Sequence, residues 1–502
     1  MKISFPARIF LVAFVLRLVP VLLSFNLGIG LDDMFQYDML ARSLAAGNGF
    51  RWYAQEDLPT IQPYINLDLS SVDYDPRGVL TSFRPPLYPA FLALIYFLTG
   101  VDANRFFTAR LVQAFLGAAL VPLTYALARR CFPENEKAAK ISAWVVTCYP
   151  LLVIYPLSLA TENLFFVLAS SAMLALFKAK ESLTAEDTKK EPFVSACPRS
   201  LGVVVRLNKR ARWFILAGIL LGLTALTRSV SLVFAGLSVL WIWFGLRQRK
   251  MAVLVFLTVT VVTLPWMVRN TLLHGRLTGI ESALGYDLFM GYHPEGFGTF
   301  QYPQSLELMT MMDDGLRDEI GQAKAIEFIK ADPGRFPYLA VRRLGHFFGL
   351  ERRALTYFYS NNFFGHISTP LLLTIAAIVL LPFIIVSASA AFGLAITRWR
   401  RKNLLMALFI LGYLTPHILI LGEDRFHLTL IPFLGILAAQ FWTGGLAAFK
   451  ARWQTRNGRI ALILAGLAVL LLFLNWGLEL HRDAGMLSQL LGPNGNQTYF
   501  PY

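Results

Sequence analysis

The sequence is poor in charged residues and in residues that bind metals or form disulfide bonds. Charged residues make up 15% of its 502 residues, against roughly a quarter in soluble globular proteins. Its three cysteines, Cys131, Cys148 and Cys197, have neither a disulfide pattern nor a metal-ligand spacing, and its seven histidines are scattered. We therefore predict no metal site and no cofactor.

The sequence also contains no visible internal repeat and no Gly/Ser or Gln/Asn tract. Many transporters consist of two repeated halves, so this absence counts against that class. The net charge of +15 does not indicate nucleic-acid binding, because the basic residues form short clusters at the ends of apolar runs, such as Arg398–Lys402. Clusters of this kind are typical of the cytoplasmic ends of membrane helices.

Long apolar segments are abundant instead. Hydrophobic residues make up 56% of the chain, and a helix of about 20 apolar residues crosses a bilayer because its backbone groups are all hydrogen-bonded internally. We predict an all-α polytopic membrane protein with about 11 to 13 transmembrane helices and large outer loops. The predicted helices lie near 9–27, 106–128, 139–156, 160–178, 213–229, 231–246, 251–268, 369–397, 403–421, 428–448 and 460–478. The run 86–99 is short and begins with Pro85-Pro86, which favours a re-entrant or interfacial helix.

Charge bias predicts the orientation of the chain. Lys2 and Arg8 place the N-terminus in the cytoplasm, so the first helix leads to the outer face. Residues 28–84 contain eight acidic and four basic residues, which fits an outer segment, whereas 179–212 contains eight basic and four acidic residues, which fits the cytoplasm. These features predict a multi-pass protein of a bacterial inner (plasma) membrane with its polar loops on the periplasmic or outer face.

Three parts follow from this organisation. We predict that residues 1–268 form a transmembrane module that includes the first outer loop and holds the candidate catalytic residues, that 269–365 form a large non-cytoplasmic loop segment, and that 366–502 form C-terminal helices with an outer tail. Within the second segment, Asp313–Ile329 is predicted to be an amphipathic surface helix that ends at the turn Asp332-Pro333-Gly334.

The acidic stretch just after the first helix carries the strongest chemical signal. Asp32 and Asp33 are adjacent carboxylates at the membrane surface, where mutual repulsion and desolvation are expected to raise their pKa values and make them better proton acceptors. In a helix, Asp33 and Tyr37 share a face. The alternative is that Asp32 or Asp33 only caps the helix that follows.

Several cations and polar residues lie at other junctions between loops and helices. Each could have a structural role instead of a functional one: Arg84 and Tyr88 as interfacial anchors, and Arg269 and Arg425 as snorkelling anchors. Thr161-Glu162 lies in an apolar context, where an ionisable group is a candidate for function, or else caps a helix. The candidate binding residues are Tyr37, Arg84, Tyr88, Arg269, Asn270, Glu423, Arg425 and His427.

Taken together, these stretches resemble motifs of the GT-C polytopic glycosyltransferases, in particular protein O-mannosyltransferases, aminoarabinose transferases of lipid A and RgtA-like transferases. The resemblance covers about residues 5–445. The matching residues are Asp33, Tyr37, Ala41 and Arg42 after the first helix, Pro85 to Pro89, Pro265, Trp266, Arg269 and Asn270, the run Gly285–Gly291, and Gly422, Glu423, Arg425, Phe426 and His427. Met34 stands where the family often has Glu, and Asp32 supplies an extra acidic residue on the other side of Asp33, so two questions stay open: which of the two carboxylates is catalytic, and whether a metal assists it.

The resemblance implies a GT-C-like helical bundle and an inverting glycosyltransferase. Its donor would be a polyprenyl-phosphate-linked sugar and its acceptor a lipid, glycan or protein of the cell envelope, with membrane lipids as further partners. Asp33 would accept a proton from the acceptor, and Arg84, Arg269 and Arg425 would stabilise the leaving phosphate. Two other classes remain open: a lipid or sugar transporter or flippase without covalent chemistry, and a non-catalytic scaffold.

Overall fold

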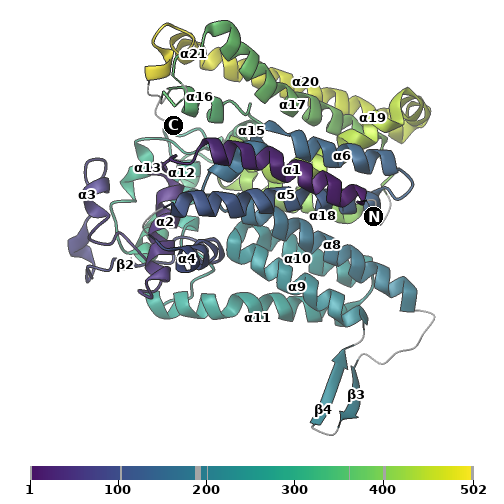
Figure 1. Ribbon diagram of the computed structural model, residues 1–502, viewed down its shortest axis with the longest axis horizontal. Helices are drawn as coiled ribbons and strands as arrows, with labels where there is room; N and C mark the ends of the chain where they lie inside the picture. Colours follow the sequence, from purple (N-terminus) through teal and green to yellow (C-terminus); the bar gives the residue numbers. More distant parts are fainter. Residues whose placement is uncertain are drawn as a thin grey trace.

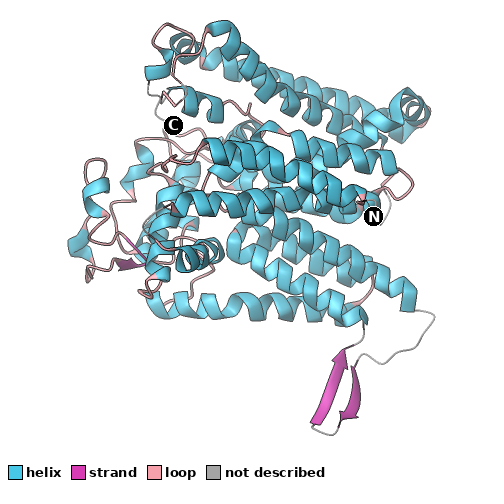
Figure 2. Cartoon of the chain, viewed as in Figure 1, coloured by secondary structure: helices cyan, strands magenta, loops and turns pink. Residues whose placement is uncertain are grey.

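The computed structural model describes residues 3–101, 104–186, 194–199, 202–207, 209–360, 362–363, 365–399 and 403–498. Helices dominate the described chain, as Figure 2 shows, and the described strands form two small two-stranded sheets. The predicted all-α class is therefore confirmed. Part of the predicted cytoplasmic segment 179–212, namely residues 187–193, 200–201 and 208, lies outside the described residues.

Eight stretches among the described residues are long and apolar enough to cross a membrane. They comprise α1 (Phe5–Leu23), α5 (Arg105–Cys131), α8 (Glu162–Glu186), α9 (Lys209–Thr227), α11 (Arg249–His274), α17 (Thr369–Ile396), η5 (Asp424–Leu430) with α19 (Ile431–Trp453), and α20 (Arg456–Arg482). Three shorter apolar stretches accompany them: α4 (Leu87–Thr99), α10 (Leu232–Leu240) with the π-helical turn η4 (Trp241–Gly245), and α18 (Leu404–Leu419). Each predicted helix region thus contains a helix, and the total number of crossings stays a prediction.

One predicted helix is in fact broken. The segment 139–156 forms α6 (Glu136–Cys148) and then α7 (Pro150–Ile154) with the turn η2 (Tyr155–Leu157), and the two parts are bent by 57°. The cause is Pro150, because the residue before a proline avoids the α conformation. Tyr149 accordingly has extended backbone angles. With this bent pair, the described residues contain up to nine candidate spans.

The remaining elements are short and lie mainly in the polar segments. The helices are α2 (Asp33–Ala45), α3 (Leu58–Ile61), η1 (Leu69–Ser71), η3 (Ser229–Ser231), α12 (Leu284–Tyr292), α13 (Gln304–Glu307), α14 (Asp314–Ala331), α15 (Arg335–Phe347), α16 (Arg353–Ser360), α21 (Ala484–Leu490) and η6 (Gly495–Gln497). The strands β1 (Arg51–Trp52) and β2 (Val79–Leu80) pair antiparallel, as do β3 (Val194–Arg199) and β4 (Gly202–Leu207). The predicted surface helix is confirmed as α14, which Asp313 caps by accepting from Leu316 N at 3.0 Å.

The two polar segments gather at one end of the helical bundle, which we call the loop end. Figure 1 shows α2, α3, α12 and α13 at this end, and the start of α1 and the β3–β4 pair at the opposite end. The segments share one hydrophobic core, in which Leu40 and Trp52 of the first pack with Phe289, Met290 and other residues of the second. The two loops therefore form one folded unit over the helix ends.

The apolar helices differ in how much of their surface other helices cover. In α8, 67% of the membrane-length window is buried, whereas in α20 only 17% is buried. The exposed side chains of α20 are mostly large and apolar, for example Leu467, Leu470, Leu471 and Leu474. In water such a surface would be unfavourable. We conclude that the chain is a multi-pass integral membrane protein, with α8 central and α20 at the lipid boundary.

Candidate active site

Asp32 and Asp33 have different roles at the start of α2, the first helix of the loop end. Asp32 is its N-cap and accepts from Met34 N at 2.9 Å, so the capping alternative holds for Asp32. Asp33 is the first helical residue, and its side chain is 23% exposed. Because Asp32 satisfies the helix start, the Asp33 carboxylate is free to reach other elements.

Asp33 is held between two arginines that are far apart in the sequence. Its Oδ1 accepts from Arg84 Nη2, and its Oδ2 accepts from Arg425 Nη2 at 2.6 Å. Arg84 lies just before α4, and Arg425 lies in η5. Arg84 is further positioned by Gln36 Oε1 at 2.8 Å and by the Tyr37 ring at 5.5 Å. The predicted face that Asp33 and Tyr37 share therefore meets Arg84.

These contacts overturn the predicted direction of the Asp33 pKa shift. Burial opposes the ionisation of Asp33, but the positive charges of Arg84 and Arg425 outweigh it and hold the pKa of Asp33 well below its ordinary value. The prediction of a raised pKa is therefore wrong for Asp33. For Asp32 it is confirmed: desolvation first, and the Asp33 charge second, raise its pKa.

A second buried ion pair lies beside the first. Glu162 Oε1, at the start of α8, accepts from Arg228 Nη1 at 2.5 Å, and Glu162 is only 2% exposed. The guanidinium groups of Arg228 and Arg425 contact the same Phe426 ring, at 5.0 and 5.7 Å from its centroid. Glu162 was weighed in the sequence as a functional candidate or a cap. Its ion pair with Arg228 now places it next to Asp33.

The second outer segment adds two carboxyl groups that sequence reasoning missed. It docks on the loop that carries Arg84, because Ser282 N donates to Ser82 O at 2.9 Å. Glu281 accepts from Ser229 Oγ, whereas the Asp287 carboxyl group has no hydrogen-bond or ion-pair partner among the described residues. Burial, followed by the nearby Glu281 charge, raises the pKa of Asp287 to about 7.

We call these residues the loop-end cluster: Asp33, Arg84, Glu162, Arg228, Glu281, Asp287 and Arg425. It contains three guanidinium groups and two carboxylates that are paired with them. Burial also raises the pKa of Glu281, which favours its neutral form. At Asp33 itself two guanidiniums meet one carboxylate, and such a local excess of positive charge at a membrane surface can bind an anion.

Two predicted binding residues, Arg269 and Asn270, lie elsewhere. Arg269 Nη1 donates to Thr81 O at 2.6 Å, and its guanidinium stacks on Trp266 at 4.8 Å. Asn270 is fully buried, and its Nδ2 donates to Gly279 O and Ile280 O at 3.0 Å. Arg269 does not join Arg84 and Arg425 on Asp33, because its hydrogen bonds hold the loop before Arg84 instead.

Three further residues that we predicted to bind substrate form hydrogen bonds or ion pairs within the protein. Tyr88 is fully buried and donates to Gln113 Oε1 at 2.6 Å, so it is not an interfacial anchor. Glu423 accepts from Arg353 Nη1 and Phe300 N at 2.9 and 2.7 Å. His427 is fully buried between Glu351 Oε1 at 2.8 Å and Phe347 O at 2.7 Å. We assign these three to positioning: Glu423 and His427 fix the segment that carries Arg425.

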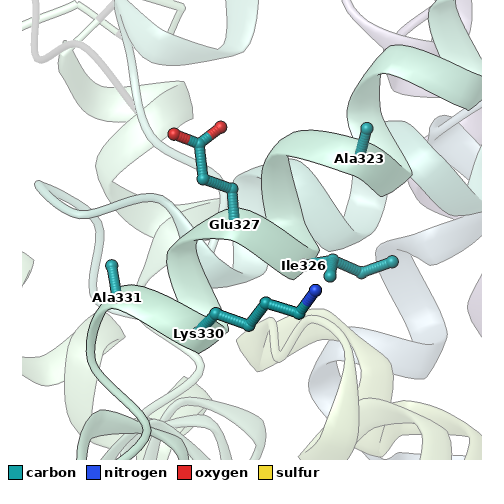
Figure 3. Close-up of a pocket in the computed structure, with 5 residues that line it drawn as sticks. All are labelled: Ala323, Ile326, Glu327, Lys330 and Ala331. Atoms are coloured by element: carbon teal, nitrogen blue, oxygen red, sulfur yellow. The ribbon is translucent and has the colours of Figure 1, made fainter.

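A surface hollow lies away from this cluster. Figure 3 shows it on α14, where Glu327 and Lys330 point from one helix into open surroundings. None of its five lining residues belongs to the loop-end cluster. Among the described residues there is also no group of three or more His, Cys, Asp or Glu side chains arranged to hold a metal ion.

Comparisons with known proteins give similarity in structure only. No protein-family model and no curated protein sequence matches the chain. The solved structures that are similar include the Archaeoglobus fulgidus oligosaccharyltransferase tethered with an acceptor peptide (14% identity, 100% of this chain and 60% of that chain, TM-score 0.49). Another is AglB of the same organism in complex with an inhibitory peptide and a dolichol-phosphate (15% identity, 99% and 60%, TM-score 0.48).

A third similar structure is ArnT from Cupriavidus metallidurans bound to undecaprenyl phosphate (14% identity, 88% of this chain and 80% of that chain, TM-score 0.38). The chain spans about 60% of the length of the archaeal oligosaccharyltransferase chains. With identities of 14–15% and TM-scores below 0.5, both the fold and the chemistry have to be argued from this chain's own residues.

Proposed function

We propose that this chain is an inverting glycosyltransferase. It moves a sugar from a polyprenyl-phosphate-linked donor to a lipid, glycan or protein of the cell envelope. The observation that supports this most is the position of Asp33 between Arg84 and Arg425, at helix ends where apolar segments meet polar loops. A lipid-linked sugar phosphate has the matching order of parts: an apolar tail, an anion and a polar sugar.

The reaction is a displacement at the anomeric carbon of the donor sugar. An acceptor hydroxyl attacks this carbon, its proton passes to the Asp33 carboxylate, and a new carbon–oxygen bond forms. The bond from the same carbon to the phosphate oxygen breaks, and its electron pair leaves with the phosphate as polyprenyl phosphate. Attack opposite the leaving group inverts the configuration at that carbon.

The leaving phosphate needs positive charge and no proton. Arg84 and Arg425 are the groups we assign to it, because both guanidiniums lie on Asp33 and so border the point of reaction. Arg269, the third cation considered from the sequence, supports the loop before Arg84 through Thr81 O. We assign it a positioning role.

The loop end faces the non-cytoplasmic side of the plasma membrane in this proposal. The charge of the loops supports this orientation: residues 28–84 are predominantly acidic, whereas basic clusters such as Arg247–Lys250 and Lys450–Arg459 flank the opposite helix ends. A donor with its sugar on the outer face would then reach the cluster from the outer leaflet.

Replacing Asp33 by asparagine tests the reaction. We expect Asp33→Asn to lower transfer at least 100-fold, because positioned general-base catalysis contributes roughly 100- to 10,000-fold. The measurement is mass spectrometry of the cell envelope from a strain without the gene, complemented by wild type or variant. Complementation by wild type alone restores the missing sugar; equal restoration by Asp33→Asn contradicts the role of Asp33.

A second experiment, with purified protein, separates an enzyme from a transporter or flippase. A glycosyltransferase leaves a covalent difference of one defined sugar on an envelope molecule. A transporter would change the sidedness of a lipid-linked sugar and leave purified protein without transfer activity. Detection of the glycosylated product with purified protein, donor and envelope extract therefore supports the proposal, and its absence with an intact donor pool contradicts it.

A further inference from the structure

Asp33 fills a site whose geometry suits a larger anion. Its two oxygens bridge two guanidiniums, each through a single nitrogen, Nη2 of Arg84 and Nη2 of Arg425. A phosphate group also offers two oxygens on one atom, and arginine binds phosphate and carboxylate by the same fork of donors. The carboxylate and a donor phosphate would therefore compete for the same pair of cations.

Arg425 has an unused donor at this point. Its Nε is buried and has no hydrogen-bond partner among the residues that the structure describes. Nε and Nη2 form one edge of a guanidinium, so Asp33 uses only half of the edge that faces it. A buried donor without a partner is costly and is normally satisfied by a ligand or water. A phosphate, with more oxygens than a carboxylate, can engage both nitrogens of this edge.

Both guanidiniums have contacts besides Asp33. Arg84 Nε donates to Gln36, and its guanidinium lies 5.0 Å from the Phe83 ring centroid. Arg425 lies against Phe426. The group is also accessible, because the side chains of Asp33, Arg84 and Arg425 are 23, 19 and 35% exposed. The two arginines are thus a preformed anion site that Asp33 covers.

We infer that Asp33 occupies the phosphate site of Arg84 and Arg425 until a donor phosphate displaces it, so that donor binding releases the base. The inference rests on the proposed function, since it takes the donor to be a polyprenyl phosphate ester. It also explains how a carboxylate in two ion pairs can act as a base. Once the arginines bind phosphate, Asp33 loses the contacts that make it a weak proton acceptor, and its oxygens become available to an acceptor hydroxyl.

The test measures binding and needs neither sugar nor acceptor. Undecaprenyl phosphate is titrated into the full chain in nanodiscs, and undecaprenol, which lacks the phosphate, serves as the neutral probe. Removing the internal competitor by Asp33→Asn is expected to tighten undecaprenyl phosphate binding by about tenfold, which corresponds to a site that is open roughly a tenth of the time. Undecaprenol binding should change less than about twofold.

Asp32→Asn is the matched control. It removes the same charge one residue away, asparagine can still cap α2, and among the described residues Asp32 forms no hydrogen bond or ion pair with either arginine. Its phosphate affinity should therefore stay within about twofold of wild type. Arg84→Gln and Arg425→Gln should each weaken phosphate binding at least about fivefold, and thermal stability of every variant is measured to check folding.

Unchanged or weaker binding by a folded Asp33→Asn variant overturns the inference. Equal tightening by Asp32→Asn overturns it as well, because a general charge effect would then account for the gain. The outcome is separate from that of the proposed function. If Asp33→Asn tightens phosphate binding but loss of the gene removes no sugar from the envelope, the competition stands and the glycosyltransferase proposal fails.

Discussion

At the scale of single residues, the carboxyl groups of the loop-end cluster differ in their partners. Asp33 and Glu162 are each ion-paired to arginine, whereas Asp287 has no such partner among the described residues. An unpaired, partly buried carboxyl group is unfavourable when ionised. Two groups of the same chemical type therefore differ strongly in acidity, a pattern that separates proton-handling roles in many active sites.

We predict that Asp287 makes the stability of the folded chain depend on pH. Burial and Glu281 raise its pKa in the folded chain to about 7, above its unfolded value, so the folded state binds the extra proton. The folded chain is then favoured at low pH, and this advantage is lost as pH rises through about 7. Asp287→Asn, which cannot ionise, should raise the melting temperature by roughly 1–3 °C at pH 8 and by less at pH 5, because the penalty grows as the pH rises from the unfolded pKa toward about 7.

Thermal unfolding in detergent at the two pH values measures this effect. Asp313→Asn is the control, because Asp313 is an exposed residue of the same outer segment and asparagine can also cap α14. The change in melting temperature that Asp313→Asn causes relative to wild type should be the same at the two pH values. Stabilisation by Asp287→Asn of equal size at pH 5 and pH 8 would show that ionisation of Asp287 is not the cause.

At the scale of elements, α12 presents Asp287 because it crosses α14 at unusually short range. A Cβ added to Gly285 would lie 1.9 Å from Asp318 O, and one added to Gly321 would lie 2.5 Å from the Gly285 carbonyl carbon. Gly285 N also donates to Asp318 Oδ1 at 2.6 Å. Only glycine on both helices permits this backbone contact, so the pair fixes the depth of α12.

Gly285→Ala should therefore destabilise the loop end. The added methyl group has to displace α14 backbone, and overpacking of this kind typically costs about 1–3 kcal/mol. Gly477→Ala in α20 is the matched control, since nothing lies within 4 Å of the added Cβ. That control should be neutral or stabilising, because alanine favours a helix interior by roughly 0.5–1 kcal/mol. Thermal unfolding of both variants measures the two effects. A Gly285→Ala variant that is as stable as Gly477→Ala would contradict the close crossing of α12 and α14.

At the scale of the whole molecule, function depends on which side of the membrane the loop end faces. Tyr64 is 69% exposed in the first outer segment, and Glu134 lies exposed between α5 and α6 at the other end of the bundle. In the proposed orientation, the first lies outside and the second lies in the cytoplasm. A reversal of this orientation would place the cluster on the wrong side of an outward-facing donor.

Cysteine labelling tests the orientation. In a chain whose cysteines are replaced by alanine, Tyr64→Cys should react with a membrane-impermeant maleimide in intact spheroplasts. Glu134→Cys should react only after permeabilisation, and it serves as the control for membrane integrity. Labelling of Glu134→Cys before permeabilisation, with Tyr64→Cys protected, would mean that the loop end faces the cytosol and would remove the basis of the proposed function.

The sequence by itself determined the membrane class, the approximate position of each long helix and the surface helix α14, and it singled out Asp33, Arg84 and Arg425 as candidate site residues. It could do so because apolar length, capping residues and turn signals act over a few neighbouring residues. Only the tertiary structure decided which charges meet. Arg425 reaches Asp33 across 392 positions of sequence, whereas Arg269 and His427 turn to partners inside the protein. Such long-range contacts set the direction of the Asp33 pKa shift and bring Asp287 close to the other charged residues of the cluster. Local sequence patterns carry no information about them.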